Sequence, residues 1–125
     1  MKKTVNIPNA PAPVGPYSQA VIHNDLMIAS GQIAIDPNNG KIIKGHVASE
    51  LEQILKNIDA LLNAADLKRE NILKCSIFLK NMDDFAELNE IYANYFSEPF
   101  PARETVEVAR LPKDVNIEIS FIAAK

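Results

Sequence analysis

Two stretches of this sequence repeat apolar residues at helical spacing, and each is enclosed by stretches that alternate as β-strands do. The apolar positions of the first are Val47, Leu51, Ile54, Leu55, Ile58, Leu61, Leu62 and Ala65. Residues three and four apart share one side of an α-helix, so this spacing predicts a long amphipathic helix with a single buried stripe. Such a helix needs an apolar surface of similar length to pack against.

The second helical stretch is shorter and has clear start and stop signals. Asp83 or Asp84 can cap its first turn, because a short carboxylate side chain accepts from free backbone N–H groups. Its apolar stripe consists of Phe85, Leu88, Ile91, Tyr92 and Tyr95. The segment 97–101 contains two prolines, which end a helix. The sequence therefore predicts two helices of unequal length.

Strand patterns fill most of the remaining chain, at 19–22, 26–30, 32–35, 72–79, 103–109 and 115–124. The turn signal Asn24-Asp25 predicts a hairpin between the first two, and Gly31 is expected to end the second. Four prolines at 8, 11, 13 and 16 predict an extended arm that ends at Tyr17. The element order predicts the α+β class, with a single mixed β-sheet and two helices on one face.

The sheet face that the helices leave open has an unusual composition. Strand alternation places on it Lys74, Ser76, Phe78, Asn116, Glu118, Ser120 and Ile122. This mixture is too apolar for a free surface and too polar for a core. Faces of that kind usually contact a partner chain.

Length and composition exclude several classes of protein. A chain of 125 residues fits one domain, residues 1–125, and 47% hydrophobic residues suffice for a core without metal or disulfide. It has no apolar run near the roughly twenty residues that a membrane span needs. The net charge of −3 and the scattered lysines argue against nucleic-acid binding.

The few cysteine and histidine residues give no sign of a metal or redox centre. Cys75 is the one cysteine and lies in a strand pattern, so a buried, reduced thiol and a cytoplasmic location are expected. Lys2 and Lys3 are not followed by an apolar stretch, which argues against a secretory signal. His23 and His46 have no ligand spacing, so no catalytic metal is predicted.

Arg103 and Glu118 are the two residues with the clearest chemical potential. They are predicted to lie on two neighbouring strands, where a planar guanidinium can hold a carboxylate or phosphate in bidentate fashion. Glu118 interrupts an apolar strand and shares its polar face with Asn116 and Ser120. The alternative is a surface ion pair, worth about 0 to 1 kcal/mol.

Four segments of the chain resemble the RidA/YjgF family, the reactive-intermediate (enamine/imine) deaminases. They are Asn9-Ala10-Pro11-Ala12-Pro13-Val14-Gly15-Pro16-Tyr17-Ser18-Gln19-Ala20, Ser30-Gly31-Gln32-Ile33, Asp84-Phe85-Ala86-Glu87-Leu88-Asn89, and residues 101–119 from Pro101 to Ile119. The resemblance spans nearly the whole chain in register. It implies a chorismate-mutase-like α+β subunit that forms a homotrimer with clefts at the subunit interfaces.

The resemblance also implies roles for individual residues. Arg103 stands where the family binds the substrate carboxylate, and Glu118 where it activates a water. Three further residues, Tyr17, Ser30 and Gly31, match pocket positions, and Asn89 is a further substrate-binding candidate. Tyr17 is equally well interpreted as an anchor for the N-terminal arm, and Ser30 as the end of a strand.

Two residues depart from the family pattern beside the arginine. Glu104 stands where many members have a small residue, and Thr105 where many have a cysteine, so chemistry proposed for that cysteine cannot operate here. An inward Glu104 would compete with an anionic substrate for Arg103. Alternation instead predicts that it lies on the opposite face of the strand.

The activity implied by the resemblance is hydrolysis of 2-imino or 2-enamino acids, such as 2-iminobutanoate and 2-iminopropanoate, to 2-oxo acids and ammonia. No cofactor is expected, because an imine carbon is already electrophilic. A non-catalytic regulatory module that binds a small carboxylate through Arg103 and Gly31 is an alternative. An endoribonuclease or translation inhibitor is a third, which the acidic balance of the chain disfavours.

Overall fold

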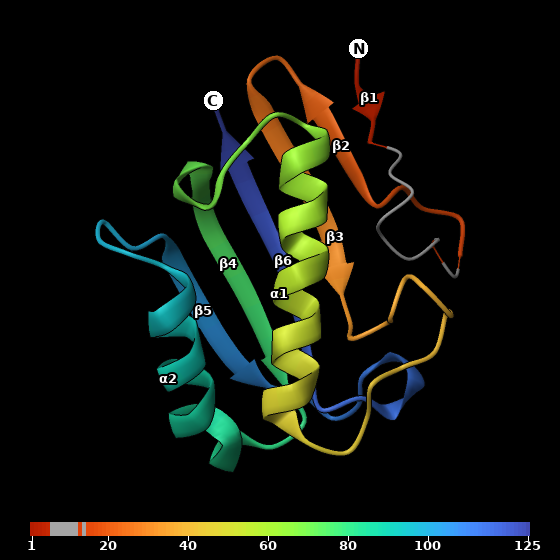
Figure 1. Cartoon of the computed structure of the whole chain (residues 1–125), viewed down its shortest axis with the longest axis vertical. Coiled ribbons are helices and arrows are strands. Elements are labelled where there is room, and N and C mark those ends of the chain that lie inside the picture. The colour runs from red at the N-terminus through yellow and green to blue at the C-terminus, as the bar shows by residue number, and fades with distance from the viewer. Residues whose placement is uncertain (6–12, 14) are drawn as a thin grey trace.

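The structure is a computed structural model that describes residues 1–5, 13 and 15–125. Its described part forms one six-stranded sheet with the order β1-β2-β3-β6-β4-β5. The strands are β1 (Lys3–Thr4), β2 (Ala20–His23), β3 (Leu26–Gln32), β4 (Ile72–Leu79), β5 (Ala102–Glu107) and β6 (Ile117–Ala124). Helices α1 (Val47–Ala64) and α2 (Phe85–Tyr95) both lie in front of the sheet in Figure 1. The predicted α+β class, with a mixed sheet and two helices on one face, is confirmed.

The chain connections explain why both helices share a face. Strands β3 and β4 are each antiparallel to β6, and β5 is parallel to β4. The segments β3-α1-β4 and β4-α2-β5 are therefore two successive crossovers between parallel strands, stepping the same way along the sheet. Crossovers of this kind are almost always right-handed, which puts both helices on one side.

The main core lies between α1 and the centre of the sheet. The helix residues Leu51, Ile54 and Leu61 are fully buried, and every residue of the predicted stripe is buried except Ala65, which follows the helix and is partly buried. On β6 the buried positions alternate with half-buried ones. The buried residues of β6, at most 2% exposed, are Ile117, Ile119, Phe121 and Ala123. Burial on this scale is the main stabilising contribution.

The prediction that Arg103 and Glu118 lie on neighbouring strands is wrong. Strand β4 lies between β5 and β6. β6 lies at the centre of the sheet, where one of its faces is fully buried. Four of the six residues of β5 are exposed, which is compatible with a strand at the edge of the sheet. The segment between β5 and β6 contains the 3-10 turn η3 (Pro112–Asp114).

The end of β3 also differs from the prediction. Gly31 does not end the strand, which continues to Gln32, and the separate strand expected at 32–35 is absent from the structure apart from one bridge between Ile35 and Ile42. The register shifts between Ala29 and Gln32, so Ser30 and Gly31 together face Ser120. This irregularity is a β-bulge, which redirects side chains locally.

Other bounds move by a few residues. The strands expected at 19–22, 103–109 and 115–124 run over 20–23, 102–107 and 117–124, whereas 72–79 is confirmed. Strand β1 was not predicted. The proline-rich arm expected before Tyr17 lies mostly outside the described residues.

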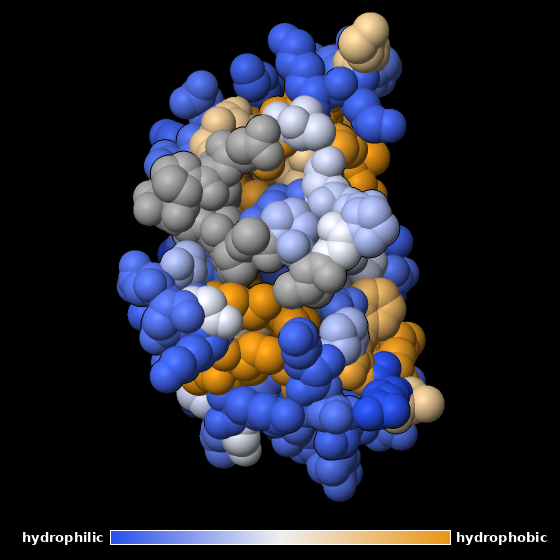
Figure 2. Space-filling view, turned by 90° about the vertical axis from the view of Figure 1, so that its right-hand side faces the viewer, coloured by the Kyte–Doolittle hydropathy of each residue, from blue (hydrophilic) through white to orange (hydrophobic). Residues whose placement is uncertain are grey.

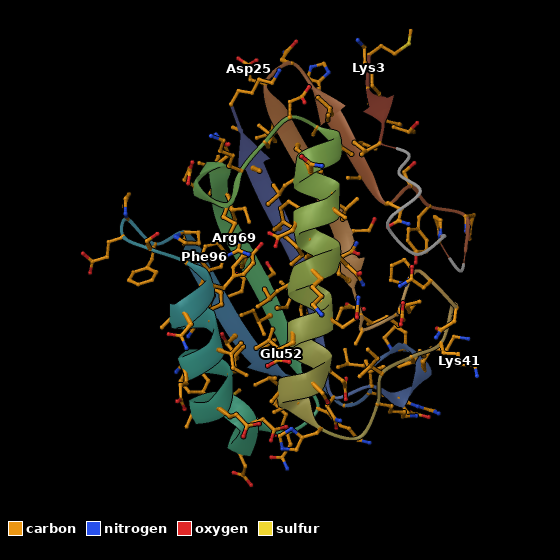
Figure 3. The ribbon with its side chains drawn as sticks, in the orientation of Figure 1. Lys3, Asp25, Lys41, Glu52, Arg69 and Phe96 are labelled. Atoms are coloured by element: carbon orange, nitrogen blue, oxygen red, sulfur yellow. The ribbon has the colours of Figure 1, made fainter. Side chains whose placement is uncertain are left out.

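A polar cluster fixes α2 against the rest of the fold. Asp59 of α1 accepts hydrogen bonds from Arg69 Nε at 3.0 Å and from the Tyr95 hydroxyl at 2.6 Å. The Arg69 guanidinium also lies 3.9 Å from the centre of the Tyr95 ring. In Figure 3, Arg69 and Phe96 lie close together at the C-terminal end of α2. The cluster thus holds in place the helix that carries part of the candidate site.

No helix among the described residues is long and apolar enough to cross a membrane.

Candidate functional site

A hollow of about 380 Å³ opens at the end of β3, on the sheet face that the helices leave bare. Its wall includes Tyr17, Ser30, Gly31, Ile33, Pro112 and Glu118. Figure 2 views the molecule from the side where the loop between β3 and α1 lies, and shows an apolar patch bordered by hydrophilic side chains there. The hollow brings together four of the residues singled out in the sequence, from segments far apart in the chain.

Gly31 and Glu118 lie close together in this hollow. A Cβ atom at position 31 would lie 2.6 Å from the carboxyl carbon of Glu118 and 2.7 Å from its Oε2. The missing side chain of Gly31 is therefore what allows the carboxylate to lie over the bulge of β3. A glycine serves here for close approach, not for an unusual backbone angle.

Glu118 has the electrostatic setting of a proton-transfer group. It is half-buried and has no salt bridge among the described residues. Burial raises the pKa of the Glu118 carboxyl above its ordinary value, because the charged form is partly stripped of water. A raised pKa brings a carboxyl closer to the range in which it exchanges protons at neutral pH.

Ser30 and Tyr17 form the side of the hollow nearest the N-terminus. The Ser30 hydroxyl donates a hydrogen bond to the carbonyl of Ser18 at 2.6 Å, and its backbone N–H donates to Gln19 at 2.9 Å. Ser30 therefore ties the segment after Tyr17 to β3, and the hydroxyl proton is already engaged. Tyr17 is about half exposed at the mouth of the hollow.

Arg103 lies on the other face of the sheet, beneath α2. Its guanidinium carbon is 4.8 Å from the centre of the Tyr92 ring and 5.5 Å from that of Phe85. Among the described residues no carboxylate pairs with it. Two aromatic rings thus support a cation whose hydrogen-bonding fork has no acidic partner, which is the arrangement that an anionic ligand requires.

The surroundings of Arg103 contain polar groups with few partners. Asn89 lies one helical turn from both Phe85 and Tyr92, so it shares their side of α2. The Thr105 hydroxyl is buried without a hydrogen bond to the described residues. Burial raises the pKa of Cys75 to about 11, so its thiol stays protonated at neutral pH and is a poor nucleophile.

Glu104 faces away from Arg103, as strand alternation predicted. It accepts a hydrogen bond from the Ser76 hydroxyl at 2.6 Å, and its other oxygen lies 3.2 Å from Lys74 Nζ. These two partners lower the pKa of the Glu104 carboxyl. Within one subunit Glu104 therefore does not compete for the guanidinium.

The candidate residues fall into two groups that lie on opposite faces of the sheet. Tyr17, Ser30, Gly31 and Glu118 line the hollow on the open face, whereas Arg103 and Asn89 lie on the helix face near the edge strand β5. The sequence placed Phe85 and Tyr92 in the apolar stripe of the second helix but did not connect their rings with Arg103. Their seven-residue spacing on one side of the predicted second helix was the available signal.

The structure gives no grounds for a metal centre in its described part. No group of three or more His, Cys, Asp and Glu side chains there is arranged to hold an ion.

Comparisons with known proteins match the whole chain. The family described as Endoribonuclease L-PSP matches residues 7–125. The 2-iminobutanoate/2-iminopropanoate deaminase of Escherichia coli K12 is 46% identical over 128 residues, covering 100% of this chain and 99% of the relative. A crystal structure of the Rid family protein YyfA from Yersinia pestis, 43% identical, superposes with a TM-score of 0.97 and covers 100% of both chains.

A third similar protein is E. coli TdcF, whose crystal structure contains bound serine. It is 38% identical, with a TM-score of 0.92 and 98% of each chain covered. The fold and the full-length identities place this chain in one class of small α+β proteins. The chain belongs to the Rid (RidA/YjgF) family.

Proposed function

We propose that this protein hydrolyses small 2-imino and 2-enamino acids, such as 2-iminobutanoate and 2-iminopropanoate, to 2-oxo acids and ammonia. The observation that carries the proposal is the half-buried Glu118, with its raised pKa, lying over Gly31 in an open hollow. The E. coli relative named as a deaminase for these two substrates supports it. We assign the activity to the cytoplasm, in keeping with a single buried, reduced thiol.

The proposal includes assembly into a homotrimer with its sites at the subunit interfaces. Glu118 and Arg103 lie on opposite faces of one sheet, so a site that uses both must take them from two copies. The open face offers half-buried or exposed apolar side chains for such contacts, among them Ile28, Phe78, Val106 and Ile122. A closed ring of three copies would complete three equal sites.

The reaction needs only groups that this chain supplies. Arg103 of one subunit holds the substrate carboxylate through charge-assisted hydrogen bonds, worth about 1.5 to 3 kcal/mol each. Water attacks the C2 carbon of the protonated imine while the Glu118 carboxylate of the adjacent subunit takes one of its protons. This forms a carbinolamine, in which C2 carries a hydroxyl and an amino group.

The second half of the reaction returns that proton. The protonated Glu118, or water, gives a proton to the amino nitrogen, and the C–N bond breaks with its electron pair leaving on ammonia. Glu118 is a carboxylate again once it has given up this proton. The remaining hydroxyl proton passes to solvent, which leaves the 2-oxo acid. Both directions of transfer require a carboxyl pKa that is not far below neutral, which desolvation of Glu118 favours.

A direct assay tests the proposal and its arginine. A threonine or serine dehydratase generates the imino acid in situ, and its disappearance is followed with and without the protein. We expect clear acceleration, a loss of about 100-fold or more in kcat/KM for Arg103→Ala, and a smaller but distinct loss for Arg103→Lys, which keeps charge but not the bidentate fork. Equal rates with and without the parent protein would refute the deaminase.

The binding-module alternative predicts a different result at Glu118. A Glu118→Gln variant that still binds a small carboxylate but no longer turns over, beside an active parent, supports the enzyme. Binding by both proteins with turnover by neither supports the module. The family description as an endoribonuclease is not favoured for this chain, because its net charge of −3 gives little attraction for a phosphate backbone.

A further inference from the structure

One fully buried carboxylate, Glu50, has no part in the chemistry proposed above. It lies in the first turn of α1 and has no exposed surface. Both of its oxygens accept hydrogen bonds from Asn116: Oε1 from the backbone N–H at 2.9 Å and Oε2 from the side-chain amide in a short contact. A buried carboxylate is retained only where such partners offset its loss of water.

Asn116 is held from a third direction as well. Its carbonyl accepts a hydrogen bond from the backbone N–H of Lys80, just after β4, at 2.9 Å. The residue immediately precedes β6, so it links the start of α1, the end of β4 and the start of β6 at one point. Glu50 therefore fixes where β6 begins.

The turn that leads into Asn116 adopts a disfavoured backbone. Lys113 and Asp114 both have positive φ angles, 59° and 54°, which non-glycine residues rarely adopt in succession. The contacts that support them are exposed ones, from Arg110 to Asp114 at 2.9 Å and from Lys44 to the Lys113 carbonyl at 3.0 Å. The pair of bonds to Glu50 is the buried polar anchor of this turn, beside the buried side chains of Leu111 and Val115.

The two ends of the anchored segment both reach the hollow. Pro112, four residues before Asn116, forms part of its wall, and Glu118, two residues after, supplies its carboxylate. A change at Asn116 is therefore transmitted both to the wall and to the proposed base. We propose that Glu50 is a positioning residue that sets the geometry of Pro112 and Glu118 through Asn116. This inference rests on the proposed function for its kinetic test.

Three variants separate the hydrogen bonds of Glu50 from its charge and bulk. Glu50→Leu fills a similar space but accepts no hydrogen bond. Glu50→Gln keeps the contact, because its amide oxygen accepts from the Asn116 N–H and its amide nitrogen donates to Asn116 once that side-chain amide is flipped. Asn116→Ala removes the side-chain half of the contact only. Glu52→Gln, an exposed position two residues along α1 and labelled in Figure 3, is the matched control.

We expect kcat to fall at least about tenfold in Glu50→Leu and several-fold in Asn116→Ala, with KM changed less than about threefold, because the arginine that holds the substrate is untouched. Glu50→Gln and Glu52→Gln should stay within about threefold of the parent. A role confined to stability would lower Tm and leave kcat unchanged. Parental kcat in both Glu50→Leu and Asn116→Ala overturns the proposal, and if Glu50→Leu does not fold, Asn116→Ala decides.

A structural readout keeps this test separate from the proposed reaction. Should the parent protein hydrolyse no imino acid, the proposed function fails, but the positioning role is still decided by NMR. In Asn116→Ala we then expect faster hydrogen exchange of the backbone amide at position 116, because its bond to Glu50 is no longer supported by the side-chain bond, and a shifted carboxyl resonance of Glu118; Glu52→Gln should show neither change. Unchanged resonances at both positions would refute the role of Glu50.

Discussion

The two faces of the sheet carry two halves of a site that are built in opposite ways. On the open face, Glu118 lies over a glycine in a hollow, with desolvation as the cause of its raised pKa. On the helix face, Arg103 rests on two aromatic rings without an acidic partner among the described residues. One half offers a proton acceptor without an anion-binding group, and the other an anion-binding group without a proton acceptor.

This difference teaches that one subunit cannot bring Arg103 and Glu118 together, as the proposed reaction requires. Among the described residues the Arg103 guanidinium has no acidic partner and the Glu118 carboxylate has no basic one, so each can still bind a further charged group. If they met within one subunit they would form an ion pair and neutralise each other. In the proposed trimer, separation across the sheet would keep both groups available until two copies and a substrate bring them together.

The largest expected effect comes from mixing two inactive proteins. Arg103→Ala and Glu118→Gln subunits should each show under about 1% of parental turnover, whereas trimers reassembled from equal amounts should recover about a quarter, because each site draws its arginine and its carboxylate from different subunits. The rates are measured after joint refolding or co-expression.

The control for this mixture is the double variant in a single chain. A chain that carries both substitutions can supply neither group to a neighbour. When it is mixed with the parent protein, turnover should therefore only fall, in proportion to the number of sites that contain a variant residue. If the two single variants regain nothing when mixed, the divided site is wrong.

A smaller effect tests the open-face half by itself. Gly31→Ala places a methyl group within 2.6 Å of the Glu118 carboxyl carbon, so the flexible carboxylate must move aside. We expect a folded protein with kcat about tenfold lower, since a displacement of this size spoils the alignment of the water. Steady-state kinetics measure it.

The same substitution in a Glu118→Gln background distinguishes the cause. There Gly31→Ala should lower kcat no further, because the group through which it acts is already lost. A full additional tenfold loss would show that Gly31 acts through its backbone rather than through Glu118.

Much of the fold was predictable because it rests on periodicity. The stripes of α1 and α2 and the strand at 72–79 follow from spacing alone, and so does the outward direction of Glu104. The strand order was not predictable from the local pattern. Strands β5 and β6 are joined by a short segment, which would allow them to pair directly. They do not pair, because the apolar face of β6 is buried under the helices only at the centre of the sheet.

The candidate site, too, could be predicted only in part from local sequence patterns. The residue types were visible in the sequence, but not the bulge that lets Ser30 and Gly31 both face Ser120, nor the two bonds from Asn116 to Glu50. Such contacts join residues dozens of positions apart through side-chain geometry. No local spacing encodes them, and only the assembled tertiary structure reveals them.

The smallest expected effect is on stability, and its sign separates a functional carboxylate from a structural one. The native pKa of Glu118 is raised, so the native state binds its proton more tightly than the unfolded chain. Stability contributed by this group is then present below the unfolded pKa and is lost as pH rises through the native pKa. Glu118→Gln carries no charge and escapes that loss.

We therefore expect Glu118→Gln to be more stable than the parent near pH 8, by less than about 1 kcal/mol given solvent screening at a half-buried site, and equal to it near pH 4. Urea unfolding at the two pH values measures the difference. A parent that is the more stable protein at pH 8 would mean that the carboxylate is held by favourable contacts, as Glu50 is, and not kept ready for proton transfer. Glu118 on the open face would then be a structural carboxylate like the buried Glu50, and the two would no longer differ in role.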